Sequence, residues 1–277
     1  MVFLHLVLIS IIQGLTDPLP VSSSGHLVLF HQFVGGGELS GDAAAQAREI
    51  DIAVHIGTLV ALILYFWRDV LDLTKGTLNM ITGNLKSDEA KLLQYLFVAS
   101  VPAVIAGFFL SQLDAAFFYD LKRLAVLNIV FGLLLYAADK WGKSLKSMDD
   151  MGFKSALMFG LSQILALIPG VSRSGITMTA GRALGFDRIS AARFSLLMAL
   201  IITAGAGALG TYEVVSEGGF SLGSQFIWAI IMSFVASYIA LVLLMKFLKN
   251  YDFTPFMIYR VLFGIVVLIA VYTGILA

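Results

Sequence analysis

Six long apolar stretches constrain this 277-residue chain more than any other feature. A helix needs about 20 mostly apolar residues to cross the hydrocarbon core of a membrane. Only 13% of the residues are charged and 59% are hydrophobic, whereas a soluble domain carries about 25% charged residues. The sequence therefore predicts an all-α integral membrane protein and excludes a soluble enzyme. The six predicted spans are Ile50–Trp67, Leu92–Leu110, Leu124–Ala138, Ala192–Tyr212, Ser224–Phe247 and Met257–Leu276.

Two further apolar stretches are too short to span a membrane, and each leads into a polar segment rich in Gly, Pro and Ser. Backbone of this kind is tolerated at membrane depth only where it is buried in protein or lines a cavity. We therefore interpret both as re-entrant helix–loop–helix hairpins. Their first halves, breaks and second halves are Val2–Ile12, Gln13–His26 and Leu27–Val34, and then Phe153–Ile168, Pro169–Thr177 and Met178–Phe186.

The basic residues give this arrangement an orientation. If the hairpins do not cross, one side of the membrane receives only Arg48, Lys122 and Arg123, and the other side receives the remaining fifteen of the 18 basic residues. The positive-inside rule makes the richer side cytoplasmic. The sequence thus predicts both termini outside and a cytoplasmic loop at Lys75–Lys91. The N-terminal segment lacks a basic residue before its apolar run and reads as mature protein rather than signal peptide.

The two breaks also indicate an internal repeat. Gln13 precedes Pro20 and the run Val-Ser-Ser-Ser-Gly, and Gln163 precedes Pro169 and the run Gly-Val-Ser-Arg-Ser-Gly. Three spans follow each hairpin, so the second half lies upside down relative to the first. Inverted repeats with broken helices place their site near the midplane. The sequence predicts one membrane domain, 1–277, with inverted halves at about 1–140 and 150–277.

The residues of the two breaks are suited to binding an anion. In each break a Ser-X-Ser-Gly turn precedes a half-helix, whose free N–H groups and dipole favour phosphate. Arg173 adds a permanently charged planar fork that matches phosphate oxygens. The candidate residues are Gln13, Asp17, Ser22, Ser23, Ser24 and His26 in the first break, and Gln163, Ser172, Arg173, Ser174 and Thr177 in the second.

Structural interpretations compete with these functional ones. Serine in membrane helices commonly serves close packing, Asp17 before Pro18 can simply end a helix, and His26 can be a hydrogen-bonded packing residue. Arg173 can extend to the cytoplasmic surface as a charge that determines topology. We expect that role for Arg182, Arg188 and Arg193, and a structural role for His55 and Arg260.

The two motifs resemble those of the undecaprenyl-pyrophosphate phosphatases, also called the bacitracin-resistance phosphatases. The first motif is Gln13-Gly-Leu-Thr-Asp17 followed by Leu-Pro-Val-Ser-Ser-Ser-Gly-His26, and the second is Pro169-Gly-Val-Ser-Arg-Ser-Gly-Ile-Thr177. The resemblance runs the length of the chain and includes Pro255–Arg260. It implies removal of the terminal phosphate from the C55 polyprenyl diphosphate carrier in the bacterial cytoplasmic membrane, which returns the monophosphate to cell-wall synthesis. Asp17 stands where the family usually has Glu.

The resemblance and the residues together suggest roles. We expect Ser23 to be the nucleophile and His26 its proton carrier, with direct attack by water activated by Asp17 or His26 as the alternative. Arg173, Ser174, Thr177 and the loop amides would hold phosphoryl oxygens, with Ser22, Ser24 and Ser172 beside them. Gln13 and Asp17 would offer oxygens to a divalent cation, Mg²⁺ or Ca²⁺.

A transporter of a lipid phosphate is the competing function, because broken helices in inverted repeats are typical of secondary transporters. The expected partners are membrane lipids and a polyprenyl diphosphate substrate, or a lipid phosphate as the cargo of a transporter. A formal net charge of zero argues against nucleic acid, and the absence of cysteine excludes a disulfide framework and a cysteine metal site. The sequence does not indicate an oligomeric state.

Overall fold

The computed structural model describes residues 3–35, 42–110, 120–216, 219–220 and 223–276. Regular structure within these ranges is helical apart from an isolated bridge between Lys146 and Phe186, which confirms the predicted all-α class. Two short 3-10 turns accompany the longer helices, η2 at Met148–Asp150 and η3 at Leu165–Leu167. The α-helices are α1 (Phe3–Thr16), α2 (Ser23–Gly35), α3 (Asp42–Tyr65), α4 (Trp67–Ile81), α5 (Asp88–Leu110), α6 (Leu121–Trp141), α7 (Phe153–Ile164), α8 (Arg173–Ala183), α9 (Arg188–Ser216), α10 (Ser224–Phe247) and α11 (Thr254–Tyr272).

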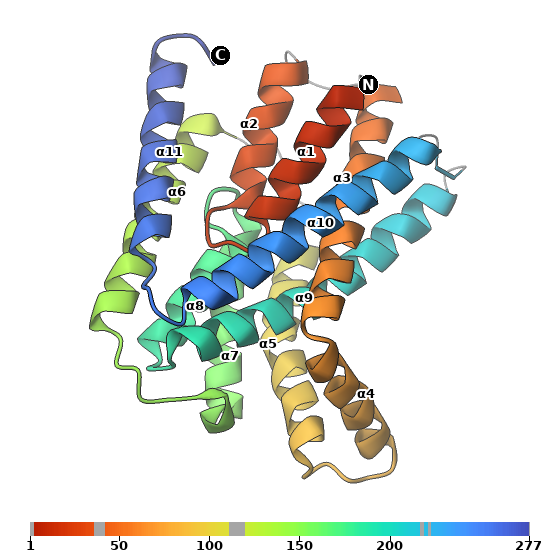
Figure 1. The fold of residues 1–277 in the computed structure, drawn as a ribbon, viewed down its shortest axis with the longest axis vertical. Coiled ribbons are helices and arrows are strands. Elements are labelled where there is room, and N and C mark those ends of the chain that lie inside the picture. Colours follow the sequence, from red (N-terminus) through yellow and green to blue (C-terminus); the bar gives the residue numbers. More distant parts are fainter. Residues whose placement is uncertain (1–2, 36–41, 111–119, 217–218, 221–222, 277) are drawn as a thin grey trace.

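Five of the described helices, α5, α6, α9, α10 and α11, are long and apolar enough to cross a membrane. A sixth candidate consists of α3 and α4, which are bent by 87° relative to each other. All six predicted spans therefore fall on helices. Figure 1 shows the start of α1 and the end of α11 at one end of the molecule and the α4–α5 connection at the other.

Helix α4 was not predicted, because its residues read as part of a charged cytoplasmic connection. It is amphipathic, with Asp69, Leu73 and Gly76 buried along one face at helical spacing. Gly76 allows close packing on α5, since an added Cβ would lie 2.4 Å from the Glu89 carbonyl oxygen. Asp69 binds Arg193 of α9, with Nε at 3.0 Å and NH2 at 2.5 Å from its Oδ1. The polar Asp69 on the buried face and the charged residues around it made the apolar face of α4 less evident in the sequence.

The two interrupted stretches form short helices, as predicted, but the breaks are shorter than the sequence suggested. Helix α1 continues to Thr16 and α2 begins at Ser23, so Gln13 and His26 lie on helices. Helix α7 is extended by η3 as far as Leu167 and α8 begins at Arg173, which places Thr177 inside α8. The predicted break boundaries were wrong because polar residues next to a helix end can still satisfy their backbone groups within the helix.

Small residues allow these short helices to pack closely on longer ones. Helix α1 packs against α10, α7 packs against α5, and α6 packs against α11. An added Cβ on Gly14 of α1 would lie 2.6 Å from the Ser233 carbonyl oxygen of α10. An added Cβ on Gly160 of α7 would lie 2.6 Å from the Ala99 carbonyl oxygen of α5. Each short helix is therefore held by backbone-level contact with a longer one.

Gly14→Ala is expected to destabilise the protein by about 1–3 kcal/mol, the usual cost of overpacking a closely packed site. The added methyl group would contact backbone and Ala236 Cβ of α10, neither of which can rotate away. Gly205→Ala on α9 is the matched control, since no atom lies within 4 Å of its Cβ position. Thermal unfolding in detergent measures both variants, and equal stability of the two would contradict the packing argument.

The expectation that Arg182 extends to the cytoplasmic surface was wrong. Its side chain is 1% exposed and its Nε donates to Asp139 Oδ1 at 2.7 Å. Arg188 donates to the same oxygen at 2.8 Å, and the Phe253 N–H donates to Asp139 Oδ2 at 3.1 Å. Asp139 therefore joins the end of α6 to α8, α9 and the start of α11. Arg182 pairs with the buried Asp139 carboxylate instead of extending to the membrane–water interface. No local sequence pattern indicates this pairing.

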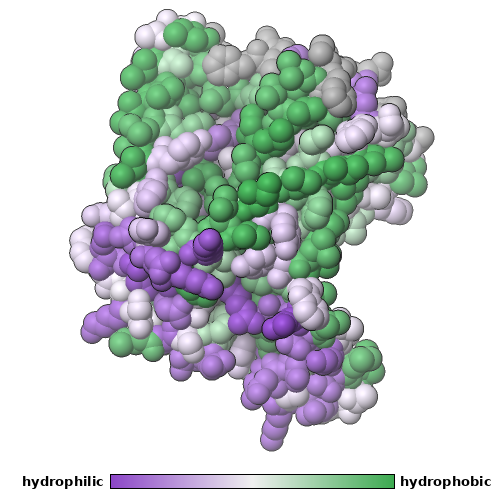
Figure 2. Space-filling model, viewed as in Figure 1, coloured by the Kyte–Doolittle hydropathy of each residue, from purple (hydrophilic) through white to green (hydrophobic). Residues whose placement is uncertain are grey.

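The surface has an apolar part and a polar part. Figure 2 shows hydrophobic residues over the upper and central face, and hydrophilic residues gathered at the α4–α5 end and around the linker that follows α6. Large apolar side chains such as Phe97, Phe108 and Val266 are more than 60% exposed. Exposed apolar area of this kind suits a lipid environment. The chain is an integral membrane protein.

Candidate functional site where the two helix breaks meet

Both breaks contain a residue in a conformation that side chains rarely adopt. Ser22 has φ 71° and Ser172 has φ 74°, and among the described residues they are the non-glycine residues with positive φ. They occupy the same position, directly before α2 and α8 respectively. Strained backbone of this kind costs of order 1–3 kcal/mol and concentrates at functional sites. The strain recurs at matched positions in the two breaks.

Hydroxyl groups reinforce the two turns in the same way. Ser22 Oγ lies 3.4 Å from Ser24 Oγ, and Ser172 Oγ lies 3.4 Å from Ser174 Oγ. The Gly175 N–H donates to Ser172 Oγ at 3.1 Å, which makes Ser172 the N-cap of α8. The backbone N–H groups in the first turn of α2 and of α8 have no acceptor within their own helix. The predicted Ser-X-Ser-Gly helix starts are therefore present in both breaks.

The two breaks lie against each other through Asp17. Arg173 NH2 donates to Asp17 Oδ2 at 3.0 Å, and Ser23 Oγ donates to Asp17 Oδ1 at 3.3 Å. Ser174 Oγ donates to the Leu19 carbonyl oxygen at 2.7 Å. Asp17 is 8% exposed and the Arg173 side chain is 20% exposed. The carboxylate thus links the predicted nucleophile in one break to the predicted phosphate-binding arginine in the other.

Thr203 of α9 completes the support of Arg173, and the sequence reasoning missed it. Its Oγ1 accepts a hydrogen bond from Arg173 NH1 at 2.9 Å. Thr177 supports the backbone of Arg173, because its hydroxyl donates to the Arg173 carbonyl oxygen at 2.8 Å and lies 2.6 Å from Ser195 Oγ. Thr177 is fully buried. Its hydroxyl therefore stabilises the start of α8.

Gln13 lies one helical turn before Asp17 and is also fully buried. Its Nε2 donates to His55 Nε2 at 3.3 Å, in the tautomer whose Nδ1–H donates to the Asp51 carbonyl oxygen at 2.6 Å. This orientation leaves Gln13 Oε1 without a partner. His55 therefore fixes the direction of the Gln13 amide, a role that its position in a span did not reveal.

The unpartnered Gln13 oxygen and the Asp17 carboxylate are suited to a divalent cation. Residues four apart share a helix face, so the two side chains can serve one ion. Within the described residues no three His, Asp or Glu side chains group as a metal cluster. Mg²⁺ is often held by one or two carboxylates together with substrate phosphates. The residues present fit an ion that shares its ligands with a phosphorylated substrate.

His26 faces α11. Its Nδ1 lies 2.7 Å from the Ser22 carbonyl oxygen and its Nε2 lies 2.5 Å from the Tyr259 hydroxyl oxygen. The imidazole ring also stacks on Phe263, with centroids 4.4 Å apart. Both ring nitrogens are thus engaged, while the hydroxyl of Ser23 is bonded to Asp17. The hydrogen bond from His26 to the Ser22 carbonyl oxygen helps to stabilise the positive φ of Ser22 at the start of α2.

Arg260 of α11 holds the second break from behind. Its NH2 donates to the carbonyl oxygens of Gly170 and Val171 at 2.8 and 2.9 Å, and its Nε donates to Asn128 Oδ1 at 2.7 Å. Arg260 is fully buried, which agrees with the structural role expected for it. An ionisable residue within a span was the one signal that could have linked it to the site.

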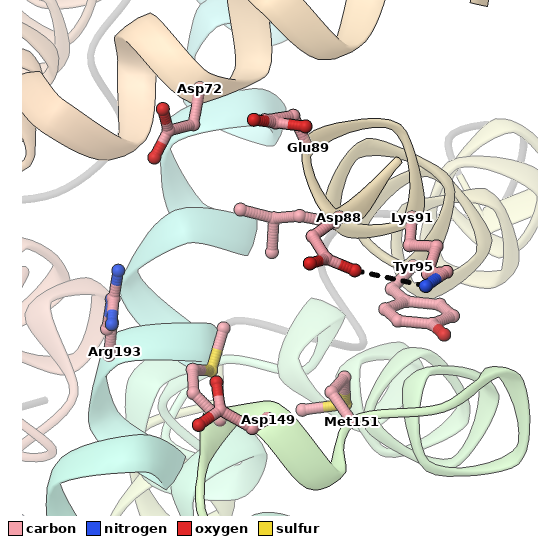
Figure 3. Close-up of a pocket in the computed structure, with 10 residues that line it drawn as sticks. Asp72, Asp88, Glu89, Lys91, Tyr95, Asp149, Met151 and Arg193 are labelled. Carbon is pink, nitrogen blue, oxygen red and sulfur yellow. Dashed lines mark hydrogen bonds and ion pairs between the residues drawn. The ribbon is translucent and has the colours of Figure 1, made fainter. Parts of the chain in front are cut away.

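A cavity of about 520 Å³ at the α4–α5 end shares no residue with the breaks. Figure 3 shows Asp72, Asp88, Glu89 and Asp149 around it, with Arg193 at one wall and Lys91 bound to Asp88. Acidic side chains outnumber basic ones in this cavity. An anionic substrate is therefore better matched by the site at Asp17 and Arg173.

Comparisons with known proteins show the family to which this chain belongs. The model of the family described as bacitracin resistance protein BacA matches residues 6–266. The undecaprenyl-diphosphatase of Jannaschia sp. (strain CCS1) is 42% identical over 271 residues, which cover 96% of this chain and 98% of the relative. The undecaprenyl-diphosphatase of Roseobacter denitrificans is 40% identical over 278 residues, covering 99% and 100%. That of Geobacter metallireducens is 42% identical over 271 residues, covering 97% and 98%.

These matches extend over nearly the whole chain, so they include both breaks and the helices around them. They confirm the resemblance drawn from the two motifs. The chain belongs to the bacitracin resistance protein BacA family.

Proposed function

We propose that this chain is an undecaprenyl-diphosphate phosphatase, which hydrolyses the C55 polyprenyl diphosphate to the monophosphate and inorganic phosphate. The names of its relatives support this activity. The observation that carries it is the contact of the two breaks, where Asp17 binds both Ser23 and Arg173. In this proposal Ser23 is the nucleophile, Asp17 is the proton acceptor and Arg173 is the phosphate-binding cation, next to two helix N-termini. Recycling of the lipid carrier for cell-wall synthesis follows from this reaction.

Ser23 is the nucleophile in the proposed mechanism. Its oxygen attacks the distal phosphorus and its proton passes to Asp17 Oδ1, which accepts its hydrogen bond at 3.3 Å. The bond from phosphorus to the bridging oxygen breaks, and that oxygen leaves with the polyprenyl monophosphate. Water then hydrolyses the phosphoserine and restores the hydroxyl. In the alternative, Asp17 activates water for direct attack and Ser23 only binds phosphate.

Positioning and charge neutralisation carry most of phosphoryl transfer. Arg173 and the first N–H groups of α2 and α8 hold the phosphoryl oxygens. The hydroxyls of Ser22, Ser24, Ser172, Ser174 and Thr177 lie around these N–H groups and shape the two turns. A divalent cation, Mg²⁺ or Ca²⁺, held by Gln13 and Asp17, would neutralise further phosphate charge.

The membrane arrangement belongs to the same proposal. The hairpins α1–α2 and α7–α8 enter from opposite sides of the bacterial cytoplasmic membrane, and their breaks meet near its midplane. Two observations support an inverted repeat within a single domain: the matched strain at Ser22 and Ser172, and the matched packing of α1 on α10 and α7 on α5. Both termini lie outside.

Cysteines introduced singly by Asn84→Cys and Ser216→Cys are expected to react from opposite sides of the membrane. The chain has no native cysteine, so each label reports one position. Asn84 lies in the basic connection between α4 and α5, and Ser216 ends α9. In intact cells a membrane-impermeant maleimide should label the Ser216→Cys variant and leave the Asn84→Cys variant unlabelled. Labelling of both positions from outside would refute the proposed orientation.

Release of inorganic phosphate from polyprenyl diphosphate by the purified protein in detergent tests the activity. Detergent removes the two compartments that a transporter needs, so turnover there is catalysis. We expect Ser23-dependent phosphate release. Specific binding of the lipid without release would instead support the competing function, transport of a lipid phosphate.

A further inference from the structure

A second, smaller cavity lies beside Arg173 and is lined by no residue of the α1–α2 break. Its volume is about 140 Å³. Its polar residues are Arg173 and Gln163, and its apolar wall is formed by Ala103, Val104, Ala166, Leu167 and Ile202. Whole-ligand pockets measure about 300–1,000 Å³, so this cavity can hold only part of a ligand.

Gln163 is the feature that points to a ligand. It is 2% exposed, and neither its Nε2 nor its Oε1 has a hydrogen-bond partner. An unpaired buried polar group costs about 1–3 kcal/mol, and here one amide leaves both of its polar atoms unpaired. Its position at the end of α7 places it on the wall that also carries Arg173. A residue that lines the cavity therefore carries two unpaired polar atoms, which a polar group entering the cavity could pair.

The outer part of the cavity is apolar and reaches the lipid-facing surface. Val104 of α5 is 62% exposed and Leu167 of η3 is 38% exposed, and both line the cavity. Helix α5 is one of the membrane-span candidates, so the surface around Val104 faces lipid. The cavity thus changes from apolar at the membrane to polar at Arg173 and Gln163.

We propose that this cavity binds the junction between the isoprenoid tail and the diphosphate of the substrate. The proximal phosphate lies between Arg173 and the Gln163 amide, and the first isoprene unit lies against Val104, Leu167 and Ile202. This assignment rests on the proposed function, because it places the distal phosphate on the Asp17 and Ser23 side of Arg173. The tail then leaves between α5 and η3 into the membrane.

The same placement gives Gln163 a part in the reaction. The bridging oxygen gains the electron pair of the broken P–O bond and leaves with the proximal phosphate. An amide N–H directed at that phosphate stabilises the developing charge. Gln163 is therefore a substrate-contacting residue on the leaving-group side, whereas Ser23 acts on the side of the transferred phosphoryl group.

Gln163→Met removes both polar atoms and keeps an unbranched side chain of similar length. We expect kcat/KM for polyprenyl diphosphate to fall by about 10- to 100-fold, the effect of one hydrogen bond to a charged group. The fall should include kcat, because the leaving oxygen is affected. The unfolding temperature should be unchanged or higher, since two unpaired polar atoms are lost. Unchanged turnover, or a loss of activity together with a loss of stability, would overturn the assignment.

Ala166→Phe fills the apolar part of the cavity, and Leu165→Phe is its matched control. Leu165 belongs to the same 3-10 turn, is 41% exposed and does not line the cavity. We expect Ala166→Phe to raise KM for polyprenyl diphosphate by about 10-fold or more, as the loss of one or two buried isoprene carbons predicts. Leu165→Phe should leave KM unchanged. Equal KM values for the two variants would refute the tail site.

A binding measurement separates this inference from the proposed activity. The probes are a polyprenyl methylenediphosphonate, which the enzyme cannot cleave, and methylenediphosphonate without a tail. Ala166→Phe should weaken binding of the tailed probe alone, and Gln163→Met should weaken binding of both. If the wild type binds the tailed probe in this pattern but releases no phosphate, the activity is wrong and the cavity assignment stands. If the wild type hydrolyses the substrate while neither variant changes binding, the cavity assignment is wrong and the activity stands.

Discussion

Ser23→Ala is expected to abolish turnover at every metal concentration. The Ser23 hydroxyl is bonded to Asp17 and lies in the first turn of α2, where it is the predicted nucleophile. Loss of a nucleophile in a serine hydrolase lowers kcat by about 10⁶-fold and leaves roughly 10³–10⁴-fold acceleration over water. Phosphate release from polyprenyl diphosphate measures the effect, and Ser216→Ala at the end of α9 is the control. Substantial turnover by Ser23→Ala would favour direct attack by water.

Asp17→Asn completes this test, because it separates the metal role of Asp17 from its other roles. The amide still offers one oxygen to a cation at lower affinity, so added Mg²⁺ or Ca²⁺ should restore part of the lost activity if Asp17 is a ligand. Asp17→Glu should be tolerated, since it introduces the usual residue of the family. Full activity of Asp17→Asn in the presence of a chelator would show that Asp17 only ends α1 before Pro18.

Arg173→Lys is expected to fold and to lose about 10²–10³-fold in kcat/KM, the cost of removing one donor from a preorganised charge-stabilising site. The guanidinium donates in two directions, to Asp17 Oδ2 at 3.0 Å and to Thr203 Oγ1 at 2.9 Å. An ammonium group keeps the charge but lacks the planar fork, so it cannot make both bonds and still direct further N–H groups at phosphate oxygens.

Arg68→Lys is the matched control for this substitution. Arg68 lies on α4, with its guanidinium 5.2 Å from the ring centroid of Trp67, and takes no part in the site. It should retain wild-type turnover. Near-normal kcat/KM in Arg173→Lys would show that Arg173 contributes only its charge, which is the role of a residue that determines topology.

Much of the architecture was determined by the sequence alone. The apolar stretches identified the spans because a membrane helix must be long and apolar over consecutive residues. This property can be recognised directly in the order of residues. The breaks were also visible, since Pro18, Pro20 and Pro169 cannot continue a helix. The two motifs that contain the repeated Ser-X-Ser-Gly turns indicated the correct family, and the anion site that they also indicate stays a prediction.

The tertiary structure decided which residues meet. The sequence could propose Asp17, Ser23 and Arg173 together, but only the packing of two breaks 156 residues apart joins Asp17 to Arg173. Ser23 and His26 share a helix face by spacing, yet His26 binds Tyr259 of α11 while Ser23 binds Asp17. Long-range contacts of this kind depend on which helices become neighbours, and no local pattern encodes that choice.

Buried polar residues show most clearly which features the sequence determines and which depend on the tertiary structure. Arg182, expected at the cytoplasmic surface, is buried against Asp139, and Gln163 is buried beside Arg173 with its amide unpaired. Sequence composition determined that this chain enters a membrane, because the free energy of moving a side chain from water into lipid depends on the type of each residue. It could not determine the partners of its polar residues, because a hydrogen bond or ion pair requires two groups at about 3 Å, and only the folded chain brings them to that distance.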